Sequence, residues 1–117
     1  MQLSNTSPPK ILGIDVSAYQ GKIDWQRVKQ AGVKFAFIKA TEGATFKDKL
    51  FKENIRDAHR AGLYCGAYHF FRPKTVIGPQ VDNFINSIRA AGVPLLPALI
   101  LKFQLIGEIF RETIELN

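Results

Sequence analysis

Apolar residues gather in four short runs along the chain, at residues 11–17, 35–41, 63–71 and 95–103, and stretches with helical periodicity separate them. Short apolar runs between turn residues predict β-strands. The second run, FAFIKAT, is almost wholly apolar, which is typical of a parallel strand covered on both faces. In the first run we expect Ile11, Leu12, Ile14 and Val16 to be buried.

The stretches between these runs predict three helices, at residues 24–31, 49–61 and 79–91. Asp24 is well placed to cap the first, and Gly32, Gly62 and Gly92 follow the three in turn. Apolar positions one turn apart define the faces that would pack on the sheet. The side chains expected to point inward are Trp25 and Val28, then Phe51, Ile55 and Ala58, then Val81, Phe84, Ile85 and Ile88.

The alternation of strand, helix and glycine predicts right-handed βαβ units and an α/β fold with a parallel sheet. This pattern is compatible with a (β/α) barrel and with an open, doubly wound sheet. Gly13 and Gly21 flank the end of the first strand at the wrong spacing for a phosphate-binding fingerprint, so the sequence gives no sign of a dinucleotide site.

Polar side chains occur where three successive strands end. Asp15 lies near the end of the first, Glu42 follows the second, and Tyr68 and His69 lie towards the end of the third. In a barrel these ends form the active site, and carboxylates beside aromatic rings suggest a carbohydrate substrate. Structural roles stay open: Asp15 capping a turn, Tyr68 packing in the core, and His69 satisfied within the sheet.

Three motifs in order, GIDVSAYQGKIDW, FAFIKATEG and GAYHFFRP, resemble glycoside hydrolase family 25, the Chalaropsis-type lysozymes of bacteria and bacteriophages. The resemblance covers about residues 11–99. It implies a TIM-barrel-like fold and cleavage of the β-1,4 bond between N-acetylmuramic acid and N-acetylglucosamine in peptidoglycan. It also implies that Asp15 belongs to the catalytic centre and that Tyr19, Glu42, Tyr68 and His69 line the sugar groove. We expect no cofactor and no metal, because His59 and His69 do not form a recognisable ligand set with the carboxylates.

The chain departs from the family where the fourth strand ends. Members of the family typically have Asp-x-Glu after a Leu-Pro-x-Leu lead, with the Glu as general acid, but here Ile100-Leu101-Lys102 follows that lead. Lysine, with a reference pKa of about 10.4, is a poor replacement for a carboxylic acid tuned to about 6. We therefore expect very weak or no hydrolysis. The alternative is a non-catalytic peptidoglycan-binding or interaction module.

The resemblance implies a longer chain than 117 residues, so we expect a barrel truncated after about four strands. The expected organisation is a flexible lead at 1–10, a partial catalytic domain at 11–103 and an atypical tail at 104–117. Open sheet edges would then favour self-association.

A shifted reading frame is one explanation of the tail. With permitted codons for residues 99–107, one G inserted after codon 99 changes the reading to Leu-Asp-Phe-Glu-Ile-Pro-Ile-Asp-Trp, which restores Asp-x-Glu in register. The tail at 105–114 also has an amphipathic helical pattern that could cover part of the sheet, so a selected, shortened protein is the other explanation.

Charge and composition restrict the partners. Sixteen Lys and Arg against ten Asp and Glu give a net charge of +6, which favours anionic partners such as a cell-wall polymer. The basic residues are spread over predicted helix faces, so we expect a solvated exterior and no nucleic-acid site. Cys65 is the single cysteine, which excludes an internal disulfide. We see no signal peptide at residues 1–10 and no apolar run of membrane-spanning length, so we expect a cytoplasmic protein that reaches the cell wall after release.

Overall fold

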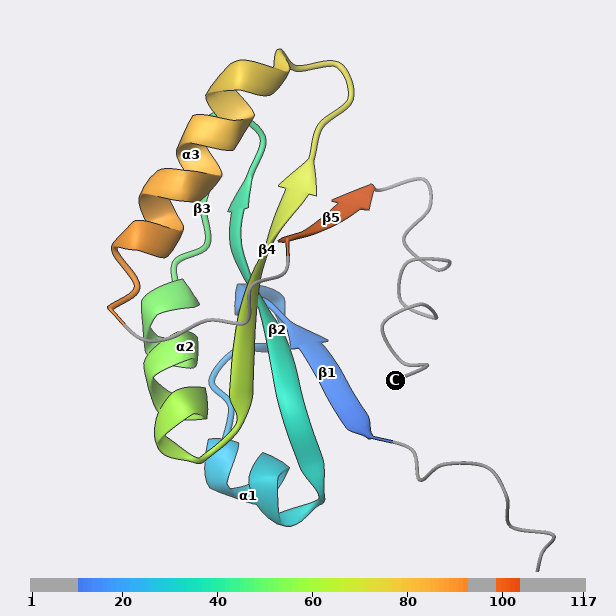
Figure 1. Cartoon of the computed structure of the whole chain (residues 1–117), viewed down its shortest axis with the longest axis vertical. Helices are drawn as coiled ribbons and strands as arrows, with labels where there is room; N and C mark the ends of the chain where they lie inside the picture. The colour runs from blue at the N-terminus through green and yellow to red at the C-terminus, as the bar shows by residue number, and fades with distance from the viewer. Residues whose placement is uncertain (1–10, 93–98, 104–117) are drawn as a thin grey trace, which may run out of the picture.

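The computed structural model describes residues 11–92 and 99–103, and the predicted lead, the tail and residues 95–98 of the fourth predicted strand lie outside these ranges. Four strands that pair in parallel and three helices follow the predicted alternation (Figure 1). The elements are β1 (Leu12–Val16), the 3-10 helix η1 (Ala18–Gln20), α1 (Trp25–Gln30), β2 (Val33–Glu42), β3 (Phe46–Lys47), α2 (Phe51–Arg60), β4 (Tyr64–Phe71), α3 (Ile77–Arg89) and β5 (Leu99–Phe103).

The sheet has the strand order β1-β2-β4-β5, and each neighbouring pair in this order is parallel. This arrangement confirms the predicted α/β class with a parallel sheet. Within the described residues β1 and β5 form the two ends of the sheet, so closure into a barrel stays a prediction.

The short strand β3 was not predicted. It pairs antiparallel with the end of β2, with Thr41 opposite Lys47 and Glu42 opposite Phe46. The connecting turn contains Gly43 at φ 58°, a left-handed conformation that favours glycine. A strand of two residues leaves no periodic signal in the sequence, which is why it could not be recognised.

Side chains of β2 alternate between two environments. Ala36, Ile38 and Ala40 are buried in the core beneath the helices. Phe35, Phe37 and Lys39 point to the opposite face, because successive side chains of a strand alternate. Figure 1 shows α2 and α3 along the same side of the strands, and this side of the sheet contains the hydrophobic core.

The predicted inward faces of α1 and α2 are confirmed. Asp24 caps α1 through its Oδ1, which accepts a hydrogen bond from the Arg27 amide at 3.2 Å. Trp25 is buried and Val28 packs against the core. In α2 all three expected side chains are buried: Phe51, Ile55 and Ala58.

Two burial predictions were wrong. Val81 is 47% exposed, because the inner stripe of α3 passes through Gln80, Asn83 and Phe84 and turns the next position towards solvent. Ile11 and Leu12 are about half exposed, since they lie at the beginning of the end strand β1. No helix in the described ranges combines the length and the apolar content needed to cross a membrane.

Gly13 on β1 leaves room for the ring of Phe35 on β2. It pairs with Phe35, and a Cβ atom at this position would overlap the Phe35 ring. We predict that Gly13→Ala lowers the free energy of unfolding by about 1–3 kcal/mol, the usual cost of overpacking. Urea unfolding of the 117-residue chain measures this change.

Gly78 provides the matched control. It lies in α3, and nothing lies within 4 Å of a Cβ built there. Gly78→Ala should leave stability unchanged or raise it by up to about 1 kcal/mol, because alanine is the better helix former. Equal effects of the two substitutions would contradict the close β1–β2 contact.

Candidate active site

The candidate residues Asp15 and Tyr68 lie on the same face of the sheet. Asp15 pairs with Phe37 across β1 and β2, and Tyr68 pairs with Lys39 across β2 and β4. Register partners point to the same side of a sheet, and Phe37 and Lys39 point away from the helices. The two candidates therefore share the face opposite the helices, which we call the open face.

Tyr68 is the buried centre of this group, with only 4% of its surface exposed. Burial raises the pKa of its phenol, and the negative charges of Asp15, Asp48 and Glu42 raise the pKa further. The hydroxyl therefore stays protonated at neutral pH and can donate a hydrogen bond. The same effect shows that three carboxylates are near enough to Tyr68 to influence its charge.

Glu42 lies at the end of β2 and forms ion pairs with Lys39 and Arg72. Burial alone would raise its pKa, but the hydrogen bonds and positive charges of Lys39 and Arg72 outweigh that effect and lower the pKa. Lys39 also lies 5.2 Å from the centre of the Phe70 ring, a cation–π contact. Glu42 is thus held as a carboxylate, which can accept hydrogen bonds but is unsuited to donate a proton.

His69 lies on the opposite side of the sheet from Tyr68. It is buried, its Nδ1 is 2.7 Å from Oγ1 of Thr41, and its Nε2 is 2.9 Å from Oε1 of Gln80. Its ring also contacts the edge of Phe84 on α3. Of the two roles that the sequence left open, the structure matches a histidine satisfied within the sheet, and His69 does not join the other candidates.

The hydrogen bonds of Gln80 indicate the tautomer of His69. The Gln80 Nε2 donates to the carbonyl oxygens of Arg72 and Thr75, at 2.9 and 3.0 Å, so its Oε1 is the atom that faces the histidine. The His69 Nε2 is therefore the atom that donates to Oε1 of Gln80. Because Oε1 of Gln80 also accepts from the Arg72 amide, this network holds the backbone beside the Arg72–Glu42 ion pair.

Tyr19 is the most exposed of the candidates, with 93% of its surface accessible. It belongs to η1, directly after β1, and a capping box of Ser17 and Gln20 holds this turn. The Ser17 hydroxyl accepts from the Tyr19 amide at 3.1 Å, and Oε1 of Gln20 accepts from the Ser17 amide at 2.7 Å. An ordered backbone thus presents an exposed aromatic ring near the carboxyl end of β1.

Asp48 is a candidate that the sequence analysis missed. It is 7% exposed, and its two carboxylate oxygens accept from the backbone amides of Ala18 and Leu50, both at 2.9 Å. Its own amide donates to the Ala40 carbonyl at 2.9 Å. Asp48 therefore links η1, β2 and the start of α2. The signal that could have revealed Asp48 is an aspartate shortly before a helix. Its carboxylate can accept from the backbone amide two residues later.

The two positions where the resemblance implies an acid pair lie beside this group in the sheet. In the backbone register, Ile100 pairs with Tyr68 and Lys102 pairs with Phe70. An Asp-x-Glu at these two positions would thus lie next to the strand that contributes Tyr68.

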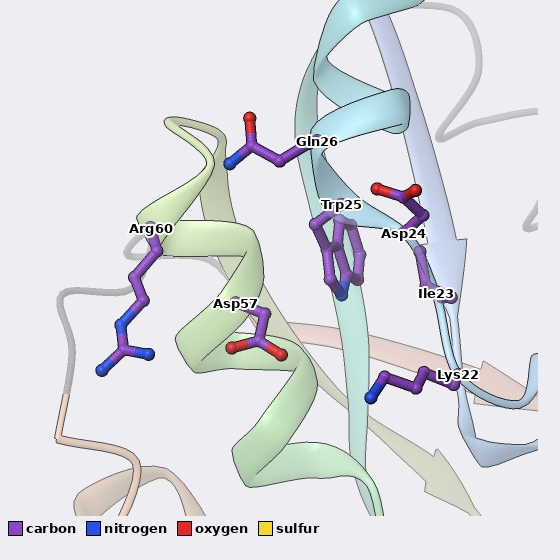
Figure 2. A pocket seen from close by; sticks show the side chains of 7 residues that line it. All are labelled: Lys22, Ile23, Asp24, Trp25, Gln26, Asp57 and Arg60. Atoms are coloured by element: carbon purple, nitrogen blue, oxygen red, sulfur yellow. The ribbon is translucent and has the colours of Figure 1, made fainter.

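Other parts of the described chain show no comparable chemistry. No group of three His, Cys, Asp or Glu side chains in the described ranges is arranged to hold a metal ion. A cavity of about 620 Å³ lies between α1 and α2, where Figure 2 shows Trp25 between the two helices. Its lining combines Lys22 and Arg60 with Asp24 and Asp57, and Asp24 is engaged as the cap of α1.

Comparison with known proteins agrees with the motifs. The profile of Glycosyl hydrolases family 25 matches residues 14–99. Lysozyme M1 of Streptomyces globisporus is 50% identical over 78 residues, which are 66% of this chain and 26% of that protein. The N,O-diacetylmuramidase of Chalaropsis sp is 37% identical over 79 residues, which are 64% of this chain and 37% of that protein.

Structural comparison gives the same result. A solved family 25 glycosyl hydrolase from Bacillus anthracis superimposes with a TM-score of 0.70 and 41% identity, over 79% of this chain and 42% of that one. The chain therefore belongs to glycosyl hydrolase family 25, the family of lysozymes and muramidases that its three motifs predicted. It spans less than half the length of each of these three relatives.

The lowered pKa of Glu42 predicts how its contribution to stability depends on pH. A carboxylate whose pKa is lowered in the folded state stabilises the fold above its unfolded pKa, and this stabilisation is lost as the pH falls through the folded pKa. We expect Glu42→Gln to destabilise the chain at pH 7, with a difference from wild type that shrinks below about pH 4.5. Urea unfolding of both proteins between pH 3 and 7 measures it. A difference independent of pH would contradict the ion-pair assignment.

Proposed function

We propose that this chain binds the glycan strands of peptidoglycan on its open face and hydrolyses them very weakly or not at all. This proposal depends on a contrast between two groups of positions. Asp15 on β1, Glu42 on β2 and Tyr68 on β4 lie at neighbouring positions of the sheet. The β5 positions paired with Tyr68 and Phe70 are Ile100 and Lys102. Family membership supports the substrate class.

The reason for weak hydrolysis is the lack of a suitable proton donor. Cleavage of a glycosidic bond requires protonation of the leaving oxygen by a carboxylic acid with a raised pKa. Glu42 cannot replace the family acid, because its ion pairs lower its pKa. Tyr68 is a poor donor as well, since burial and nearby carboxylates raise the pKa of its phenol. In this proposal the open face keeps groups that can contact sugar, while positions 100 and 102, where the resemblance implies the acid pair, are Ile and Lys.

Tyr19 gives the binding proposal a direct test. Its exposed ring can stack on a sugar face, and aromatic stacking contributes roughly 0.5–1.5 kcal/mol. We therefore expect Tyr19→Ala to weaken co-sedimentation of the chain with purified peptidoglycan about two- to tenfold. In the same samples we expect wild type to release no new reducing ends.

Tyr64→Ala is the matched control. Tyr64 is also exposed, at 69%, but it is the first residue of β4 and lies at the end of the strand away from the candidate site. It should leave binding unchanged. Equal losses in the two variants would refute the assignment of Tyr19 to the sugar site. Release of reducing ends that Asp15→Asn abolishes would refute the claim of inactivity.

We also propose that residues from 100 onwards are read in a shifted frame. The family match ends at residue 99, one position before the expected acid pair, and with the permitted codons given above one inserted G restores Asp-x-Glu there. A single lost base explains both substitutions together, whereas independent mutation requires several events.

Resequencing the gene from codon 95 onwards tests the shifted frame. We expect the determined bases, with one added after codon 99, to encode Leu-Asp-x-Glu followed by an open frame. A sequence that stays closed in that frame would refute the proposal. A selected protein that binds without hydrolysis would then be the explanation to pursue.

A further inference from the structure

A basic cavity of about 350 Å³ lies away from the open face, between the loop that follows β3, the first turn of α2 and the last turns of α3. Its lining includes three lysines, Lys47, Lys49 and Lys52, all of them exposed. The floor contains Ala40 and Phe51, both buried in the core. We call this cavity the lysine groove.

The positive charge of the lysine groove is largely uncompensated. None of its three lysines forms an ion pair within the described residues. Asp48 is the one acid in the lining, and its carboxylate is buried and accepts hydrogen bonds from the amides of Ala18 and Leu50. The groove therefore presents an excess of cations to solvent, in a chain whose net charge is already +6.

Lys47 is held in place rather than free to move. Its ammonium group donates to Oδ1 of Asn83 at 2.7 Å and to Oγ of Ser87 at 3.4 Å, both on α3. Asn83 is fixed in turn, because its Nδ2 donates to the carbonyl oxygens of Gly43 and Phe46, at 3.1 Å each. A cation anchored by neutral groups keeps its full charge, and ordering it in advance reduces the entropy lost when an anion binds.

The groove is also connected to the proposed sugar site. Asp48 lies between Lys47 and Lys49, and its carboxylate binds the Ala18 amide, next to the exposed Tyr19. The loop that presents the lysines is thus bonded to the turn that presents the aromatic ring.

We propose that the lysine groove binds a cell-wall polymer with repeated phosphodiester groups, of the poly(glycerol phosphate) type. Lysine ammonium groups are strong point-charge partners for phosphate, and Ser87 and Asn86 supply neutral donors beside them. Several cations along one groove suit a chain of regularly spaced anions. This inference rests on the proposed function, because it assumes that peptidoglycan is the surface on which the chain acts.

The test compares two cell-wall preparations, one with its phosphodiester polymer and one from which the polymer has been removed chemically. We expect the wild-type chain to sediment more strongly with the first, and this difference to decrease with salt. The variant Lys49→Gln/Lys52→Gln should lose the difference, and its salt dependence should fall by about one to two in log–log slope. Both lysines are exposed, so the variant should fold, which circular dichroism checks.

The matched control is Arg27→Gln/Lys34→Gln, which removes the same charge from exposed positions on α1 and at the beginning of β2. It should retain the difference between the two preparations. Equal losses in both double variants would overturn the inference, because they would indicate attraction by net charge alone.

Two further results separate the remaining explanations. Soluble poly(glycerol phosphate) should displace the chain from intact walls better than duplex DNA at the same phosphate concentration, and equal displacement would overturn the inference. Binding of wild type to polymer-free peptidoglycan reports on the proposed function separately. If that binding persists without any phosphodiester-dependent increase, the groove proposal fails while the sugar site stands. If wild type does not bind polymer-free peptidoglycan, the proposed function fails.

Discussion

The parallel register of β2 with its neighbours β1 and β4 determines where the candidate side chains lie. Pairing Asp15 with Phe37 and Tyr68 with Lys39 directs both candidates away from the helices. The same register places Ala36, Ile38 and Ala40 in the core. A shift of one residue would exchange the two faces and bury the charged groups among apolar side chains. The burial of the core and the grouping of the candidate side chains on the other face are therefore two results of one register.

On the open face, neighbouring charges lower the pKa of Glu42, and burial together with nearby carboxylates raises the pKa of Tyr68. Three carboxylates influence Tyr68, and Lys39 and Arg72 hold Glu42 in its ionised form. Glycoside hydrolysis needs two carboxyl groups with different pKa values, one protonated and one ionised. On this face the pKa of Glu42 is lowered by its ion pairs, and the β5 positions paired with Tyr68 and Phe70 are Ile100 and Lys102. The proposed loss of hydrolysis thus depends on two positions of a single strand.

Much of the fold was predictable because its signals are local. The apolar runs and the glycines after each helix located the strands and helices, and the motifs identified the family. Side-chain direction was harder to predict. Adjacent residues Tyr68 and His69 point to opposite faces, and the partners of His69 on β2 and α3 are far away in sequence. Asp48 was missed for the same reason, because its contact with Ala18 spans 30 residues. Val81 was misplaced since the polar residues Gln80 and Asn83 occupy the inner stripe of α3.

The most direct measurement is to follow the backbone amide NMR signals of the labelled chain during titration with a soluble glycan fragment of peptidoglycan. The account predicts shifts confined to the ends of β1, β2 and β4, above all at Tyr19, Glu42 and Tyr68, with α2 from Arg56 to Arg60 unaffected. It also predicts that the fragment remains intact. Shifts centred on α2, or no shifts at saturating fragment, would contradict a sugar site on the open face, and cleavage of the fragment would contradict the claim that this site lacks its proton donor.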